Sequence, residues 1–213
     1  CLAGLIPAAA QTTVETFSGI DCLIVSRYDR AEIDGQWQRI HQEDTCQALG
    51  ADPDANNRRG KYEHAGGPSL AQVADVLDRY AADPVGGQHK LLAATVFTVL
   101  IGNADAHAKN ISVLHSPDGH ITLAPTYDTV PTVLWPQLPT RPGMFIDGVN
   151  DIRNAERSHL AAEAQRWHLS PDSADATIVE TARAAVDALA DLRDGIPQDL
   201  ADYVTAKATQ LLT

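Results

Sequence analysis

Four side chains with the chemistry to handle a phosphate group lie within the ten-residue stretch IGNADAHAKN. Asp105 could accept a proton from a hydroxyl, and His107 and Lys109 could donate hydrogen bonds to phosphate oxygens. The amide of Asn110 and the carboxylate of Asp128, 18 residues later (128 − 110), offer the hard oxygens that Mg²⁺ prefers. A base, metal-holding oxygens and cations are what catalysis of phosphoryl transfer needs.

The segments on either side of this stretch are expected to position it. Residues 88–101 are apolar nearly all round, which predicts a helix buried at the centre of a globular domain, and Gly102 ends it. Residues 111–127 alternate between apolar and polar, with SPDG between the two runs, which predicts a hairpin. Because a hairpin returns to its start, we expect Asp128 to lie beside Asn110.

The rest of the chain is expected to be mainly helical. The stretch GGPSLAQVADVLDRY has the spacing of an amphipathic helix, whose apolar stripe is Leu70, Val73, Val76 and Leu77. Further helices are predicted from about residue 154 onward, with breaks at Pro171 and at 195–197, and TIVETARAAVDALADLRD is the clearest of them.

The part of the chain before these helices has weaker patterns. Residues 14–28 predict a hairpin around Ser18 and Gly19. Residues 29–67 are polar, with DPDANNRRG as an exposed loop, and HQEDTCQALG within them predicts a short helix ended by Gly50. The predicted fold class is therefore mainly α with two small β-hairpins.

Composition excludes some partners. The net charge of −12 argues against a broad surface for a nucleic-acid backbone, and no apolar run approaches the roughly 20 residues that cross a membrane. The three cysteines, Cys1, Cys22 and Cys46, are odd in number and lack metal-knuckle spacing, so we interpret them as reduced thiols of a cytoplasmic protein.

Each candidate residue also has a purely structural interpretation. Alone, Asp105 would be a turn or capping residue, Asn110 a strand-entry residue that satisfies the backbone, and His107 a packed or solvated side chain. A lone Asp128 would be a turn former. The order Asp, His, Asn, hairpin, Asp favours function, because otherwise each position needs its own explanation. A phosphate-ester hydrolase ranks low, since a two-metal site normally has more nearby carboxylates.

The stretches LIGNADAHAKNISV and ITLAPTYDTV closely resemble the HipA-like kinases, bacterial serine/threonine protein kinases that act as toxins of toxin–antitoxin pairs. LIVSRYDR, RIHQEDTCQALG and KYEHAGGPSL extend the resemblance over roughly residues 20–130, in the family's order. The resemblance implies the C-terminal lobe of a HipA-type kinase fold. Residues 1–30 would be a remnant of the N-terminal lobe with a hinge-like strand, and residues 31–213 the helical C-terminal lobe.

The resemblance also implies roles for individual residues. Asp105 matches the family's catalytic base, and Asn110 and Asp128 match its Mg²⁺ ligands. The positions that match its ATP-binding segments are Ser26, Arg27, Tyr28, His107, Ala108, Lys109, Asn110, Tyr127 and Asp128. At position 26 the family usually has an acidic residue, from which Ser26 departs.

Asp29 and Gln42 are further site-lining candidates under the same resemblance. Without it, Asp29 is a solvated residue of an edge strand. Gln42 is then part of a plain helix start, whose neighbouring acids favour the positive end of the helix dipole.

The family's phosphate-binding loop and strand lysine are not found in the chain. Its start, CLAGLIPAAAQTT, resembles the segment after that lysine, and the lack of an initiator Met predicts a fragment or a processed chain. The expected function is ATP-dependent phosphorylation of a protein substrate, with the activity of this chain alone left open, since positioning supplies much of such catalysis. The alternative is a non-catalytic kinase-like module that docks a HipB-like, DNA-binding antitoxin.

Overall fold

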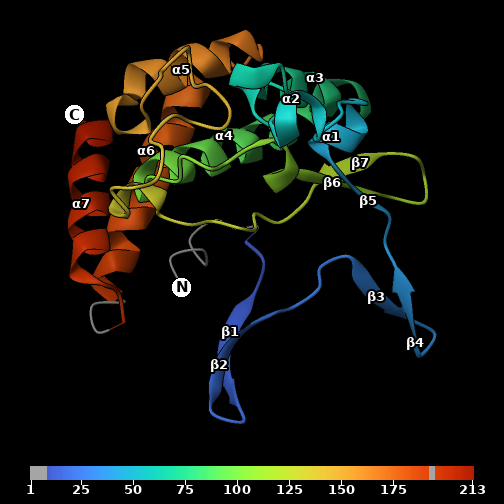
Figure 1. Cartoon of the computed structure of the whole chain (residues 1–213). Helices are drawn as coiled ribbons and strands as arrows, with labels where there is room; N and C mark the ends of the chain where they lie inside the picture. Colours follow the sequence, from blue (N-terminus) through green and yellow to red (C-terminus); the bar gives the residue numbers. More distant parts are fainter. Residues whose placement is uncertain (1–8, 192–194) are drawn as a thin grey trace.

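The computed structural model describes residues 9–191 and 195–213, so Cys1 and most of the stretch CLAGLIPAAAQTT lie outside the described residues. Figure 1 shows a body of helices from which two hairpins, β1–β2 and β3–β4, extend. The first pairs β1 (Thr12–Phe17) with β2 (Ile20–Val25), and the second pairs β3 (Arg30–Ile33) with β4 (Gln36–Arg39). None of the described helices has the length and hydropathy needed to cross a membrane.

The apolar segment forms the central helix α4 (Pro84–Ile101), which contacts four other helices and is buried along most of its length. It begins earlier than the apolar run, because the Asp83 side chain caps it by accepting from the amide of Gly86 at 3.0 Å. The surrounding helices are α3 (Leu70–Tyr80), α5 (Arg157–Arg166), α6 (Pro171–Asp191) and α7 (Gln198–Leu212). The predicted helical breaks at Pro171 and before residue 198 are confirmed.

Gly102 ends α4 in the left-handed conformation, with φ of 68°. A Cβ at this position would lie 2.2 Å from a methyl of Val133 and 3.0 Å from the ring of Tyr203. Conformation and space therefore both require glycine here, which fixes the direction in which the chain leaves the helix.

We expect Gly102→Ala to lower the free energy of unfolding by about 2–3 kcal/mol, because it adds steric overlap to backbone strain. Chemical denaturation measures the loss. Gly119→Ala is the matched control: its φ is also positive (88°), but nothing lies within 4 Å of the added Cβ. That control should lose only about 1 kcal/mol, and equal losses would contradict the packing argument.

A three-stranded antiparallel sheet lies beside the helices, in the order β5–β6–β7. The predicted hairpin is confirmed as β6 (Ser112–His115) and β7 (Ile121–Leu123). The strand β5 (Gln42–Asp44) pairs with β6 from about 70 residues away, with Gln42 opposite Leu114.

One sequence prediction about this region is wrong in part, and one hairpin was not predicted. Gln42–Asp44 was expected to open a short helix but forms a strand, and α1 (Thr45–Ala48) begins only at Thr45, capped by Asp44. The polar segment also contains the hairpin β3–β4, which turns at Asp34 and Gly35 with φ of 54° and 73°. The mainly helical prediction holds, but a third hairpin and a sheet-edge strand join the two expected hairpins.

Candidate active site at the end of α4

Asp105 is exposed at the end of a rigid, buried turn. The buried side chain of Asn103 accepts a hydrogen bond from the Asp105 amide at 3.1 Å. The hydroxyl of Tyr62 donates to Oδ1 of Asp105 at 2.8 Å. Oδ2 accepts no hydrogen bond from the described part of the chain. The carboxylate is thus held by one oxygen and leaves the other for an incoming donor.

Asn110 and Asp128 lie in direct contact, as the hairpin geometry predicted. Nδ2 of Asn110 donates to Oδ2 of Asp128 at 2.6 Å, and Oδ1 of Asn110 accepts from the amide of His107 at 3.1 Å. Asp128 takes up the left-handed backbone conformation, with φ of 55°, which aspartate tolerates better than most residues. A turn of the Asn110 amide about its terminal bond would direct two oxygens, one from each residue, toward one point.

His107 is buried in the loop beside Tyr62. It is only 5% exposed, and its ring meets the edge of the Tyr62 ring at 5.1 Å. Burial and the charge of Lys61 lower its pKa, while Asp105 and Asp128 both oppose that shift. Asp105 and Asp128 therefore act on the same imidazole from within coulombic reach. The imidazole packs inside the loop, as its structural interpretation proposed.

Lys109 points toward Asp44 in β5. Its Nζ lies 2.5 Å from Oδ2 of Asp44, and this hydrogen bond raises the pKa of the lysine. The adjacent Thr45 hydroxyl donates to the carbonyl of Ala108 at 2.5 Å. The end of β5 and the start of α1 therefore hold the short 3₁₀ turn Ala108–Asn110 in place.

Tyr127 joins the loop to Tyr28 and to strand β6. Its hydroxyl donates to the carbonyl of Lys109 at 2.5 Å and lies 2.6 Å from the hydroxyl of Ser112, which accepts from Nε2 of Gln42 at 3.0 Å. The Tyr28 and Tyr127 rings are 6.2 Å apart, and burial raises the pKa of Tyr127 to about 12. Tyr28 therefore lies beside Tyr127, and Gln42 lies beside Ser112, so both border the candidate site.

Arg27 and Asp29 form a separate ion-pair cluster. Nε of Arg27 donates to Oδ1 of Asp29 at 2.8 Å, and Arg30 approaches Oδ2 at 2.6 Å. The bonds from Arg27 lower the pKa of the 5%-exposed Asp29 to about 2. The amide of Ser26 bonds to the carbonyl of Gln11 at 2.9 Å, at the open end of β1–β2. The Arg27 guanidinium is therefore hydrogen-bonded to the Asp29 carboxylate.

The depressed pKa of Asp29 predicts a pH dependence of stability. Its folded pKa of about 2 lies below the roughly 3.9 of an unfolded chain, so its contribution is complete above about pH 4 and is lost as pH falls toward 2. We expect this contribution of Asp29 to the free energy of unfolding to be about 1–2 kcal/mol after solvent screening. Urea unfolding between pH 2 and 6 should show this slope in wild type and a shallower one in Asp29→Asn. Parallel slopes would show that the ion pairs add no stability.

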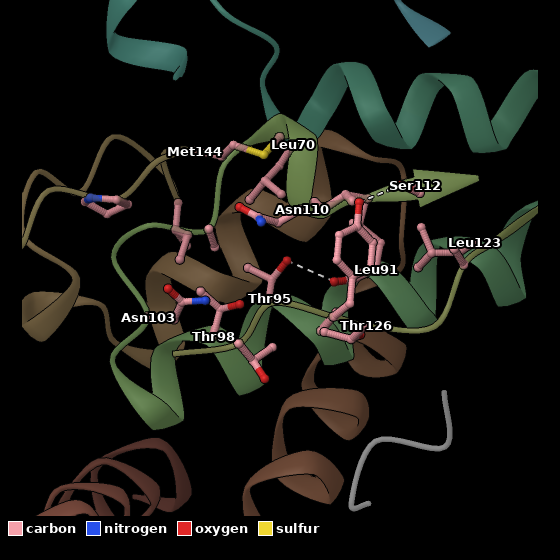
Figure 2. Close-up of a pocket in the computed structure, with 18 of the residues that line it drawn as sticks. Leu70, Leu91, Thr95, Thr98, Asn103, Asn110, Ser112, Leu123, Thr126 and Met144 are labelled. Atoms are coloured by element: carbon pink, nitrogen blue, oxygen red, sulfur yellow. Dashed lines mark hydrogen bonds between the residues drawn. The ribbon is translucent and has the colours of Figure 1, made fainter. Parts of the chain in front are cut away.

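Two hollows border the loop. A cavity of about 50 Å³ lies beneath it, and Figure 2 shows Thr95, Asn103 and Asn110 among the residues that line it. A larger cleft of about 760 Å³ has Asp105 in its wall, with Tyr62, Arg59 and Arg141 beside it. Burial and then the charges of Arg141 and Arg59 lower the pKa of His64 in the same cleft. Asp105 therefore faces a space large enough for part of another molecule.

Sequence reasoning missed three residues that hold this site: Tyr62, Asp44 and Thr45. Each acts across a long separation, since Tyr62 is 43 positions from Asp105 and Asp44 is 65 positions from Lys109. The stretches KYEHAGGPSL and RIHQEDTCQALG contain all three, so the resemblance marked the segments but not the roles.

The family model described as HipA-like C-terminal domain matches residues 3–189. The serine/threonine-protein kinase toxin HipA of Shewanella oneidensis is 29% identical over 219 residues, which are 95% of this chain and 49% of that relative. Y4mE of Sinorhizobium fredii is 43% identical over 130 residues, 61% of this chain and 30% of the relative. The chain thus spans half or less of the length of these relatives.

Solved structures are also similar. A Shewanella oneidensis MR-1 HipA, solved with HipB and operator DNA, matches with a TM-score of 0.79 and 28% identity, covering 99% of this chain and 52% of that chain. The Helicobacter pylori kinase CtkA matches with a TM-score of 0.58 and 13% identity, covering 99% of this chain and 80% of that chain. The second likeness shows a shared fold alone.

Proposed function

Because the chain belongs to the HipA-like C-terminal domain family, we propose that it provides the catalytic loop of an ATP-dependent serine/threonine protein kinase. The observation that carries this proposal is the contact between Asn110 and Asp128, which sets an amide and a carboxylate side by side at 2.6 Å. Kinase relatives and the kinase-like fold support the same reaction class. In this proposal residues 1–30 belong to the N-terminal lobe and hinge, and residues 31–213 to the C-terminal lobe.

Asn110 and Asp128 fit a Mg²⁺ ion, since both donor atoms are hard oxygens and the Asp128 side chain is exposed. When bound, the ion would neutralise charge on the phosphates of ATP. Tyr127 bonds to the carbonyl of Lys109 and keeps the loop in the conformation that presents these two residues. Lys109 keeps the loop against Asp44.

Asp105 is the proposed general base. The Tyr62 hydroxyl occupies one carboxylate oxygen, and the other is left to accept the proton of a serine or threonine hydroxyl. The acceptor segment of the substrate protein would lie in the 760 Å³ cleft that Asp105 borders. The oxygen that loses this proton then attacks the terminal phosphate, and ADP leaves.

Titration calorimetry of the chain with ATP tests the proposal directly. We expect heat of binding in the presence of Mg²⁺ that disappears with EDTA, because Asn110 and Asp128 offer no cation of their own to the phosphates. Identical binding with and without Mg²⁺ would contradict the proposed metal role.

The second candidate function is docking of a HipB-like antitoxin without catalysis. The observation that favours it is apolar side chains exposed on both hairpins, including Val14 and Leu23 (70% and 65% exposed) and Trp37 (73%). A similar structure was solved in complex with HipB. Antitoxin binding that is retained by the chain, together with no ATP binding, would favour docking alone. A cytoplasmic location fits either function and stays a prediction.

A further inference from the structure

A second cluster of metal-ligating side chains lies away from the loop, on the β5–β6 pair. His41, Glu43 and His115 each bring one ligating atom to within 4.8 Å of the other two. Nε2 of His115 lies 2.8 Å from Oε2 of Glu43, and the His41 and His115 rings have their centroids 4.6 Å apart.

The pairing of the strands brings these residues together. The amide of His115 donates to the carbonyl of His41 at 2.9 Å, which continues the register of Gln42 opposite Leu114 and sets the two histidines opposite each other. Glu43 lies two residues beyond His41, and side chains two apart on a strand point to the same face. The backbone alone therefore places all three side chains on one face.

The contact between Glu43 and His115 explains the positions of only two of the three side chains. Glu43 and His115 satisfy each other by their hydrogen bond. The His41 imidazole faces that pair and has no side-chain hydrogen bond to any residue that the structure describes. A divalent ion would give all three side chains a common partner, because imidazole nitrogen and carboxylate oxygen both bind Zn²⁺ at about 2.0–2.2 Å.

We propose that His41, Glu43 and His115 form a binding site for a divalent transition metal of the Zn²⁺ class, with a fourth position open to water. The ion would fasten β5 to β6. These strands carry Asp44, the partner of Lys109, and Ser112, the partner of Tyr127. A metal at this point would thus stabilise the sheet against which the Ala108–Asn110 turn is held. The inference does not depend on kinase activity.

Titration of the chain with ZnCl₂ under excess Mg²⁺ tests the site, with Cys1 and Cys22 replaced by Ser to remove competing thiols. We expect one equivalent of Zn²⁺ to shift the imidazole NMR signals of His41 and His115, and to raise the melting temperature. His41→Ala and His115→Ala should each weaken binding at least about tenfold, as should Glu43→Gln.

His168→Asn is the matched control, because it removes an exposed imidazole outside the cluster at a backbone position (φ of 65°) that asparagine tolerates. It should bind Zn²⁺ as wild type does. Equal affinity of the His41 and His115 variants and the control would overturn the proposal, as would no Zn²⁺ uptake by the parent chain. Should His115→Ala fail to fold, the exposed His41 still gives a decisive variant.

Discussion

Asp105→Asn is expected to lower the rate of phosphate transfer to a protein substrate by about a thousandfold. Asparagine keeps the size of the side chain and can still accept the Tyr62 hydroxyl, but it cannot take up the proton of the attacking hydroxyl. A positioned general base typically contributes about 10²–10⁴ to the rate. The measurement is transfer from radiolabelled ATP, in the longest natural form of the protein that carries this chain.

The control for this prediction is Asp75→Asn. It removes an exposed carboxylate on α3, 30 positions before Asp105 in the sequence (105 − 75). It should leave transfer unchanged. Both variants should unfold at the same denaturant concentration as wild type, to within small shifts. Undiminished transfer by Asp105→Asn would show that this carboxylate is not the base, whatever the other residues do.

The sequence predicted best what depends on neighbouring residues. The central helix, its end at Gly102 and the hairpin that follows all come from local patterns of apolarity and turn residues. The contact of Asn110 with Asp128 also follows from local geometry, because a hairpin must return to its start. This is why the contact of Asn110 with Asp128 is predictable from the sequence alone.

What the sequence missed depends on distant pairing. QED in isolation is as compatible with a helix start as with a strand, and only the partner strand β6 decides between them. The hairpin β3–β4 is an exception, because its Asp34–Gly35 turn and the alternation of Ala31 and Ile33 with polar residues are local signals of a hairpin. Tyr62 reaches Asp105 through the fold of intervening helices, which no short window of sequence encodes.

Arg27 has an ion-pair partner in the structure that the resemblance did not indicate. The resemblance placed it in a nucleotide-binding segment, whereas its guanidinium pairs with the buried Asp29. The pairing with Asp29 fixes the position of the exposed Arg27 guanidinium, and the nucleotide contact expected of Arg27 stays a prediction. The amide of Ser26 bonds to the carbonyl of Gln11, and the nucleotide contact expected of Ser26 stays a prediction.

Asp128→Ala is expected to lower transfer at least a hundredfold and to raise the Mg²⁺ concentration needed for half-maximal rate. A bound ion contributes several kcal/mol of charge stabilisation, and about 1.4 kcal/mol corresponds to a factor of ten. Asn110→Ala should show the same two effects more weakly, since it removes a neutral ligand. The measurement is the transfer rate at a series of Mg²⁺ concentrations, with Asp118→Asn as an exposed control at the far turn of the hairpin.

The double variant decides whether the two residues act on one ion. Asn110 and Asp128 touch at 2.6 Å, so their effects should be coupled and not additive. Once Asp128 is gone, loss of Asn110 should cost little more, because the ion that both would hold is already lost. Losses that multiply fully, with an unchanged Mg²⁺ requirement, would mean that the pair serves only to fix the loop and that the cation is bound elsewhere.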